Sequence, residues 1–410
     1  MSWLKEVLDS TKEFEAPSNF YYWAGLSAIS AVVKDSIFID RWSFNLYPNI
    51  YVMLHADSGL RKGPPVALAK ELVEKTGVTR IISGRSSIQG ILKELGTTQT
   101  MRSGKLLFDG KAIAYIVASE LTSSLVEDKA AATILTDLYD RSYNTGKYAS
   151  LLKMEKFVLK EPTISMLTAT NEAHANDFFE SRDIHGGFFA RTFMIHESKR
   201  NTINSLMMKP NRVPDKEKLS SYLLELSKLR GKFNGFNNDD GSLTRTGTYY
   251  KEWYDEFCNT VDNQEVKDET GTLNRFGDSV LKVAMLLSLS DSPSMEITTK
   301  HVETSINKCE QLIGNVRRAT YGKKGSSSTL VQQGLIIKEL LERTNHAITR
   351  TQLLKKYWTQ ASSEEWDKIM LSFSDSGMIQ TQSIGNEIVY VMPDEQVQLL
   401  IDHMKGKLKK

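Results

Sequence analysis

Apolar and polar positions divide the first half of the chain into short buried runs separated by helical patterns. Near the N-terminus, Trp3, Leu4, Val7 and Leu8 recur with helical spacing, and a second apolar segment, F-Y-Y-W-A-G-L-S-A-I-S-A-V-V, follows soon after. We therefore expect residues 1–47 to form an N-terminal helical segment.

Four apolar runs that are too short for helices predict buried strands. These runs are 48–54, 113–118, 163–169 and 189–196. Runs without polar alternation are typical of parallel strands whose two faces are both covered. Helical patterns lie between them, at 66–75 and 130–140. This alternation predicts an α/β domain with a parallel sheet over residues 48–205.

The second half of the chain is mainly helical in pattern. Residues 206–320 carry four helical stretches and predict a helical lid: 215–229, 244–262, 273–288 and 299–319. The segment Y-G-K-K-G-S-S-S has the composition of a linker, which we place at 321–328. Residues 329–395 then follow the order helix, helix, helix, strand, strand, which predicts a winged helix, and a basic tail occupies 396–410.

Composition restricts the classes of partner. The net charge of +2 over 410 residues is nearly neutral, so any contact with nucleic acid must come from local patches. The two cysteines, Cys258 and Cys309, have no motif spacing, which fits a reducing compartment and excludes a zinc site built from cysteines. Early charges argue against a secretory signal, and no apolar run approaches the roughly 18–20 residues that span a bilayer. We expect a cytoplasmic protein without a membrane partner.

Residues 53–66, M-L-H-A-D-S-G-L-R-K-G-P-P-V, resemble an altered phosphate-binding loop. In the pattern G-x-x-x-x-G-K-[ST], Lys62 is in place, Ala56 and Arg61 replace the two glycines, and Gly63 replaces the hydroxyl residue that holds Mg²⁺. A strand precedes this loop and a helix follows it, as such a site requires. The predicted ATP-binding residues are Asp57, Ser58, Gly59, Leu60, Arg61, Lys62 and Gly63. The alternative is a glycine turn with a solvated Arg–Lys pair.

Polar residues follow two of the predicted strands. In Y-I-V-A-S-E, Glu120 could polarise an attacking water and Ser119 could contact Mg²⁺ through water, because ligands bind at the carboxyl ends of strands in open α/β sheets. In T-I-S-M-L-T-A-T-N, Thr170 and Asn171 could orient that water. The alternatives are a helix-capping glutamate and an asparagine that begins a helix.

Two arginines are candidates for stabilising charge on the transferred phosphate. Arg191, in H-G-G-F-F-A-R, could act at a subunit edge on the neighbour's site, and Arg275, in L-N-R-F-G-D-S-V-L-K, could serve as a sensor in the lid. The alternatives are a surface arginine on a strand after a glycine turn and an arginine on a helix surface.

DNA contacts are expected on a hairpin between the second and third strands. Lys147, Tyr148 and Lys153, in N-T-G-K-Y-A-S-L-L-K, could hold single-stranded DNA by charge and stacking. An ordinary surface hairpin is the alternative. The third helix of the expected winged helix carries Glu364 and Glu365, which favours protein docking or packing over reading of duplex DNA.

The order of these features is that of AAA+-type ATPases. The stretches L-x-x-x-S-G-L-R-K, S-S-I-Q-G-I-L-K-E-L, V-A-S-E-L-T-S-S-L, L-Y-D and G-G-F-F-A-R resemble a family of helicase-like P-loop ATPases from bacteriophages, prophages and mobile elements, over residues 10–320. Members often carry an arginine where Arg61 stands, whereas Ala56 and Gly63 depart from the family pattern.

The resemblance implies nucleotide binding at Gly59, Arg61 and Lys62 and an acidic catalytic role for Glu120. It also implies ATP and Mg²⁺ as cofactors, a hexameric ring acting on DNA during replication, contact with other replication proteins, and the cytoplasm of a host cell if the protein is phage-encoded. Two further functions stay open. One is a helicase loader or replication initiator, and the other is a structural ATPase-like protein with weak catalysis.

Overall fold

The computed structural model describes most of the chain and divides it into two compact units. The described residues are 2–84, 87–96, 111–118, 129–140, 147–151, 156–171, 187–204, 210–262, 271–321, 329–357, 363–385 and 387–407. The first unit is Met1–Val316 and the second is Arg317–Lys410.

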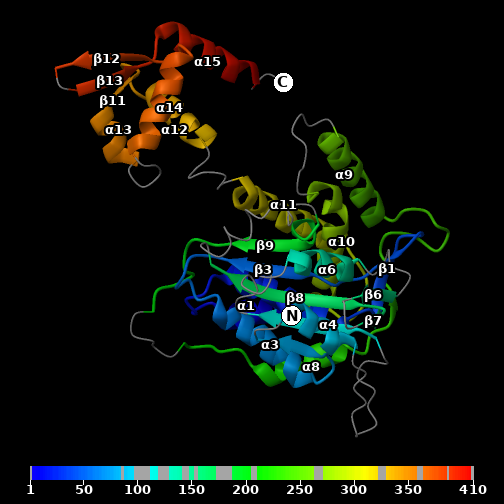
Figure 1. Ribbon diagram of the computed structural model, residues 1–410. Coiled ribbons are helices and arrows are strands. Elements are labelled where there is room, and N and C mark those ends of the chain that lie inside the picture. The colour runs from blue at the N-terminus through cyan, green and yellow to red at the C-terminus, as the bar shows by residue number, and fades with distance from the viewer. Residues whose placement is uncertain are drawn as a thin grey trace. The chain divides into compact units, whose positions relative to one another are not determined.

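A five-stranded sheet forms the centre of the first unit (Figure 1). Its strands are β3 (Tyr51–His55), β4 (Ile81–Ser83), β5 (Ile113–Ala118), β8 (Thr163–Thr170) and β9 (Thr192–His196). Their order is β4-β5-β8-β3-β9, and every neighbouring pair is parallel. The predicted α/β fold with a parallel sheet is therefore confirmed.

The strand order decides which strand ends meet. β8 lies between β3 and β5 although it follows both in the sequence. Because the strands are parallel, the residues that follow β3, β5 and β8 emerge at one edge of the sheet, here called the carboxyl edge. The residues that precede the strands lie at the opposite, amino edge.

One predicted strand begins later than expected, and one strand of the sheet was not predicted. The predicted strand at 189–196 begins only at Thr192, because Phe189–Arg191 forms a 3-10 turn (η3) in which the Arg191 N–H donates to the Phe188 carbonyl. Strand β4 was not predicted. It has three residues and lies at the edge of the sheet, so it is too short to give a periodic pattern.

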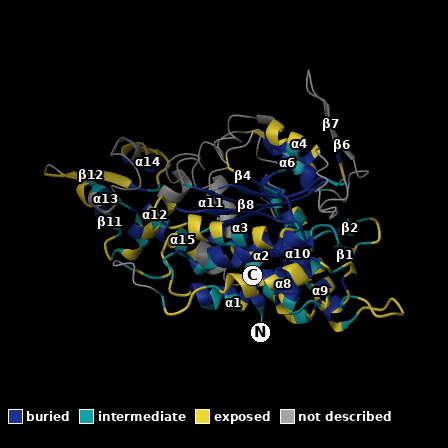
Figure 2. Ribbon diagram, turned by 90° about the horizontal axis from the view of Figure 1, so that it is seen from below, coloured by how far each residue is buried: buried dark blue, intermediate teal, exposed yellow. Residues whose placement is uncertain are grey.

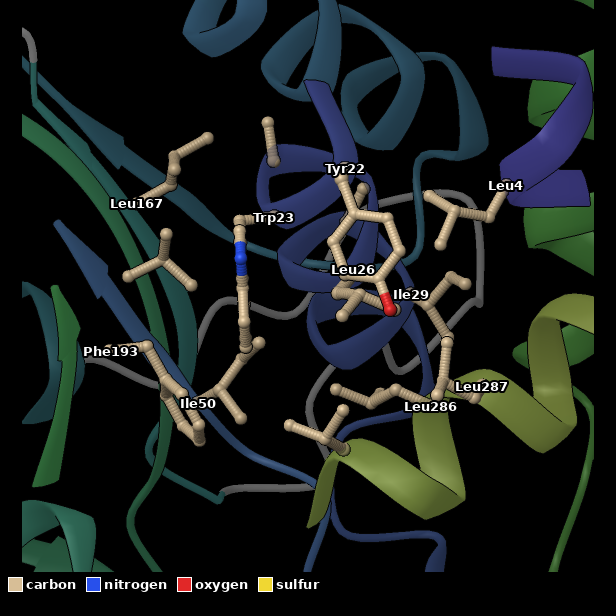
Figure 3. Packing of buried hydrophobic residues seen from close by; sticks show 14 of the residues in the cluster. Leu4, Tyr22, Trp23, Leu26, Ile29, Ile50, Leu167, Phe193, Leu286 and Leu287 are labelled. Atoms are coloured by element: carbon tan, nitrogen blue, oxygen red, sulfur yellow. The ribbon is translucent and has the colours of Figure 1, made fainter. Parts of the chain in front are cut away.

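Helices cover the two faces of the sheet. On one face are α1 (Trp3–Thr11), α2 (Ser18–Val33), α3 (Gly63–Thr76), α8 (Lys216–Leu226) and α10 (Phe276–Asp291). On the other face is α6 (Lys129–Tyr139), where the Tyr51 hydroxyl donates to the Leu135 carbonyl at 2.9 Å. Figure 3 shows Trp23 of α2 beside Phe193 of the sheet, with ring centres 5.1 Å apart.

The N-terminal segment is part of this core. Every residue of α2 from Phe20 to Val33 is buried, as expected of a helix that is apolar on all sides, and α2 is dark blue in Figure 2. Residues 37–46 depart from the expected helical segment. They form β1 (Ile37–Asp40) and β2 (Asn45–Leu46), and β1 pairs with β10 (Gly231–Lys232).

The remaining elements of the first unit are near their expected positions. Helix α9 (Arg245–Asp262) lies within the expected helical region, α10 follows a short 3-10 turn, η4 (Leu273–Arg275), and α11 (Thr299–Tyr321) begins in the first unit and continues past its last residue, Val316. The predicted hairpin is present as β6 (Lys147–Leu151) paired with β7 (Lys156–Lys160). Helix α4 (Ile88–Gly96) was not predicted.

The second unit agrees with the expected order of elements and adds two. It contains α12 (Thr329–Glu342), β11 (Ala347–Thr349), α13 (Arg350–Tyr357), α14 (Ser363–Asp375), β12 (Gln380–Ile384), β13 (Glu387–Val391) and α15 (Asp394–Lys407). Strands β11 and β12 pair on either side of β13, and Trp366 is fully buried in the core of this unit. Helix α15 replaces most of the expected tail.

Candidate functional site

The altered phosphate loop lies between β3 and α3 at the carboxyl edge of the sheet. It begins after His55 and ends where α3 starts at Gly63. Gly59 has a φ of +89° and Arg61 a φ of +53°. Arg61 therefore adopts a left-handed conformation at the position where the phosphate-loop pattern has its second glycine. Such a conformation costs a non-glycine residue about 1–3 kcal/mol and is common at functional sites.

Lys62 lies against the loop that precedes it. Its ammonium group donates to the carbonyls of Ala56, at 2.6 Å, and Asp57, at 2.9 Å. These bonds hold the charge of Lys62 next to the backbone of the loop, at the N-terminus of α3. A helix N-terminus attracts anions through its N–H groups and its dipole, and the lysine adds a full positive charge at the same place.

The first turn of α3 limits how many donors this site offers. Pro64 and Pro65 follow Gly63 within that turn, and proline has no N–H group. Gly63 also carries no hydroxyl for a magnesium ion. The loop residues 59–63 and the Lys62 ammonium fit a phosphate chain, whereas the oxygen ligand that the pattern supplies to the metal is missing at position 63.

Arg61 connects the loop to the N-terminal helices. Its Nε donates to Glu15 Oε2 at 2.9 Å, in the turn between α1 and α2. The hydrogen bond from Arg61 lowers the pKa of the Glu15 carboxyl, and the backbone N–H of Asn204 adds to this effect. The Arg61 side chain is therefore already paired with a carboxylate of the same chain, Glu15.

Asn171 directly follows β8 and lies beside the loop. Thr170, the last residue of β8, pairs with His55, and the Ala56 N–H points to the Thr170 carbonyl at 3.5 Å. Strand β5 ends on the other side of β8, with Ala118 paired to Thr168. The predicted Ser119 and Glu120 follow it directly but lie outside the described residues.

A histidine pair flanks the loop and was not predicted. His55 ends β3 and His196 ends β9, and their Nδ1 atoms are 2.9 Å apart. One ring must donate and the other accept, so the pair holds at most one proton between these two nitrogens. The residues are 141 positions apart, and only the parallel pairing of β3 with β9 brings them together.

Arg191 and Arg275 come together at the amino edge, away from the loop of their own chain. Arg191 immediately precedes β9, and its guanidinium forms a two-pronged ion pair with Asp140, one bond measuring 2.9 Å. Arg275 NH2 lies 3.2 Å from the same carboxylate. Arg191 also donates to the Gly187 carbonyl at 2.7 Å. The structure thus joins the two arginines through a third residue, Asp140, which directly follows α6.

A buried lysine lies next to this cluster. Lys282 Nζ donates to the Asn49 side-chain oxygen at 2.6 Å and lies 4.2 Å from the centre of the Tyr139 ring. Burial lowers the pKa of Lys282 to about 7, although the charge of Asp140 opposes the shift. The amino edge therefore carries a dense group of charges that the sequence pattern did not reveal.

The predicted DNA-binding hairpin begins and ends at the same amino edge. Lys147 and Tyr148 are on β6, paired with Lys160 and Leu159 of β7, and the Ala112 N–H donates to the Lys160 carbonyl just before β5. Lys153 lies outside the described residues.

The described residues contain neither a candidate metal cluster nor a candidate membrane span. No group of three or more histidine, cysteine or acidic side chains there could hold a metal ion. Among the helices in the same ranges, none combines the length and the apolar character needed to cross a membrane. Comparisons with models of protein families and with curated proteins found no match to this chain.

Proposed function

We propose that this protein is an AAA+-like P-loop ATPase that uses ATP to act on DNA, as a ring-forming replicative helicase or translocase of the bacteriophage type. One observation carries the proposal. The loop with Gly59, left-handed Arg61 and Lys62 lies at the carboxyl edge of a parallel sheet, next to Asn171 at the end of the adjacent strand. Ligands bind at this edge in open α/β sheets.

The proposed roles follow from these positions. The loop N–H groups and Lys62 would bind the phosphates of ATP, with Lys62 at the β- and γ-phosphates. Asn171 would orient the attacking water and Glu120 would accept its proton, while Ser119 and Glu120 would hold Mg²⁺ through water. Bound Mg²⁺ would neutralise charge on the phosphates.

The arginines at the amino edge are proposed to act between subunits. Arg191 lies at the opposite end of the sheet from its own loop, so it would serve the site of a neighbouring copy in a hexameric ring. Reaching that site would require it to exchange Asp140 for a phosphate. Arg275 contacts the same Asp140 carboxylate. It would change position together with Arg191 and act as the sensor of the helical lid.

A second function is favoured by the first turn of α3. Gly63 supplies no hydroxyl for a metal ion, and Pro64 and Pro65 supply no N–H groups for a phosphate. This departure fits a helicase loader or initiator in which ATP controls assembly and hydrolysis is slow. The second unit, with the element order of a winged helix, would then dock a replication partner.

The test is ATP hydrolysis with and without single-stranded DNA. We expect DNA-stimulated turnover in the wild type and its loss in Lys62→Ala. Lys70→Ala, on the same helix α3, serves as the matched control and should keep full turnover. Absence of turnover in the wild type, at concentrations where light scattering detects rings, would refute the motor. Strand displacement on forked DNA separates a motor from a loader that hydrolyses ATP.

A further inference from the structure

A large hollow lies in the first unit, apart from the phosphate loop. Its volume is about 690 Å³, which falls within the range of small-molecule sites, and it shares no residue with the loop. It lies between the β1–β2 turn, the segment that follows β10, and the start of α9. Figures 1 and 2 both place β1 beside α9 and α10.

The rim of the hollow presents an exposed aromatic side chain. Trp42 is 97% exposed and has a φ of +63°. Three hydrogen bonds hold the turn: from the Trp42 N–H to the Asp40 carboxylate at 2.9 Å, from the Arg41 N–H to the Phe44 carbonyl at 2.9 Å, and from the Ser43 N–H to the Arg41 carbonyl at 2.7 Å. The tryptophan ring is therefore open to a ligand at the rim of the hollow.

The walls of the hollow are formed by a fixed backbone. The Phe233 N–H donates to the Phe38 carbonyl at 2.8 Å, and Asn234 exchanges backbone hydrogen bonds with the segment around Ile297. Gly235 has a φ of +121°, and a Cβ atom there would lie 2.1 Å from the Ile297 carbonyl oxygen. Only glycine fits this close approach, so the shape of the wall is built into the sequence.

A buried tyrosine forms part of the wall of this hollow. Tyr250 lines it, and its side chain lies in hydrogen-bond contact with the Arg41 guanidinium. Burial raises the pKa of Tyr250, while the charge of Arg41 opposes the shift, so the hydroxyl keeps its proton at neutral pH and can donate it to a ligand. Tyr250 and Arg41 thus form one polar pair in the wall of the hollow.

The polar lining favours a particular ligand chemistry. The hollow is lined by basic groups (Arg41, Lys232, Lys251), by acidic groups (Asp40, Asp239), by side-chain amides (Asn234, Asn237, Asn238) and by aromatic rings (Trp42, Phe236, Tyr250, Tyr254). Asp255 already pairs with Lys251 at 2.5 Å. Lys232 and Arg41 are therefore the cations to which we assign a phosphate, while Trp42 offers a face for stacking.

We infer that this hollow binds a nucleotide unit of single-stranded nucleic acid, with its base stacked on Trp42 and its phosphate at Lys232 and Arg41. Stacking and charge together are how proteins hold single strands without reading their sequence. The inference rests on the proposed action on DNA and adds a second contact, separate from the β6–β7 hairpin.

The test measures the affinity of the full chain for a fluorescent oligo(dT) by anisotropy, without ATP. Trp42→Ala should weaken binding about tenfold, the effect typical of one lost base stack, and Trp42→Phe should keep most of the affinity. Lys232→Ala should lower the affinity and reduce the slope of binding against salt by about one. The matched controls Ile203→Ala and Lys228→Ala, both at exposed positions, should bind like the wild type.

The outcomes separate this inference from the proposed ATPase. Weaker oligo(dT) binding in Trp42→Ala supports the inferred nucleotide site in the hollow, even if Lys62→Ala and the wild type both lack ATP hydrolysis. Unchanged affinity in Trp42→Ala, with a melting temperature equal to that of the wild type, overturns it and leaves the ATPase untouched. Unchanged affinity together with a smaller particle mass by light scattering also overturns it, because the hollow would then be a contact between copies. Trp42→Gly repeats the test with a relaxed backbone.

Discussion

Asp140 holds the amino edge of the sheet together, and removing its charge should destabilise the first unit. Its side chain is only 15% exposed, and that of Arg191 only 9%. In Asp140→Asn, Arg191 keeps the Gly187 carbonyl as a partner but loses its counter-charge. Breaking a buried pair in this way costs about 3–5 kcal/mol. We expect the lower end, about 3 kcal/mol, because asparagine keeps the shape and one acceptor oxygen.

Arg275 adds little to this value. Its side chain is a third exposed, so its pairing with Asp140 contributes less than about 1 kcal/mol. Near the melting temperature of a large domain, each kcal/mol shifts the midpoint by about 2 °C. The transition of the first unit should therefore fall by about 6 °C in thermal unfolding followed by circular dichroism.

A matched control tests the reasoning. Asp255→Asn breaks an ion pair with Lys251 whose two side chains are 54% and 61% exposed, so its midpoint should move by less than about 1 °C. If Asp140→Asn has the same melting temperature as the control and the wild type, the Asp140–Arg191 pair does not stabilise the fold. That result would also favour an Arg191 side chain that is free to leave Asp140.

Two further predictions concern the buried lysine and the second unit. Burial lowers the pKa of Lys282 from 10.5 to about 7, so between these values the unfolded chain binds a proton that the folded chain does not. The free energy of unfolding should therefore rise from pH 7 towards pH 10, by at most about 1.4 kcal/mol per pH unit from this group. In Lys282→Met, the free energy of unfolding measured with urea should rise less between pH 7 and pH 10. An equal rise in the variant and the wild type would contradict the lowered pKa of Lys282. Trp366→Ala should destabilise the second unit by about 3–5 kcal/mol, because Trp366 is fully buried in it. Calorimetry should then show one transition lowered and the other unchanged, and a common shift of both would argue against separate units.

The local sequence pattern predicted those elements whose structure depends mainly on which of their side chains are buried. The run from Ile113 to Ala118 was predicted with its observed bounds, because a strand buried on both faces is apolar at every position. The same reasoning placed the strand before the loop, the helix after it and the order of elements in the second unit. Asn171 lies beside the loop because β8 is the parallel neighbour of β3, and parallel strands bring their carboxyl ends to one edge.

Only the tertiary structure decided which distant residues meet. Strand β1 pairs locally with β2, but its other partner, Gly231 opposite Ile37, lies nearly 200 positions away and no local pattern reports it. For the same reason the sequence did not show that Arg191 and Arg275 share Asp140, or that Lys282 is buried beside them. The sequence by itself therefore determined the elements and the loop, because periodicity records which side of each segment is buried. The charge cluster and the hollow were decided by topology, because they consist of contacts between segments that are far apart in the chain.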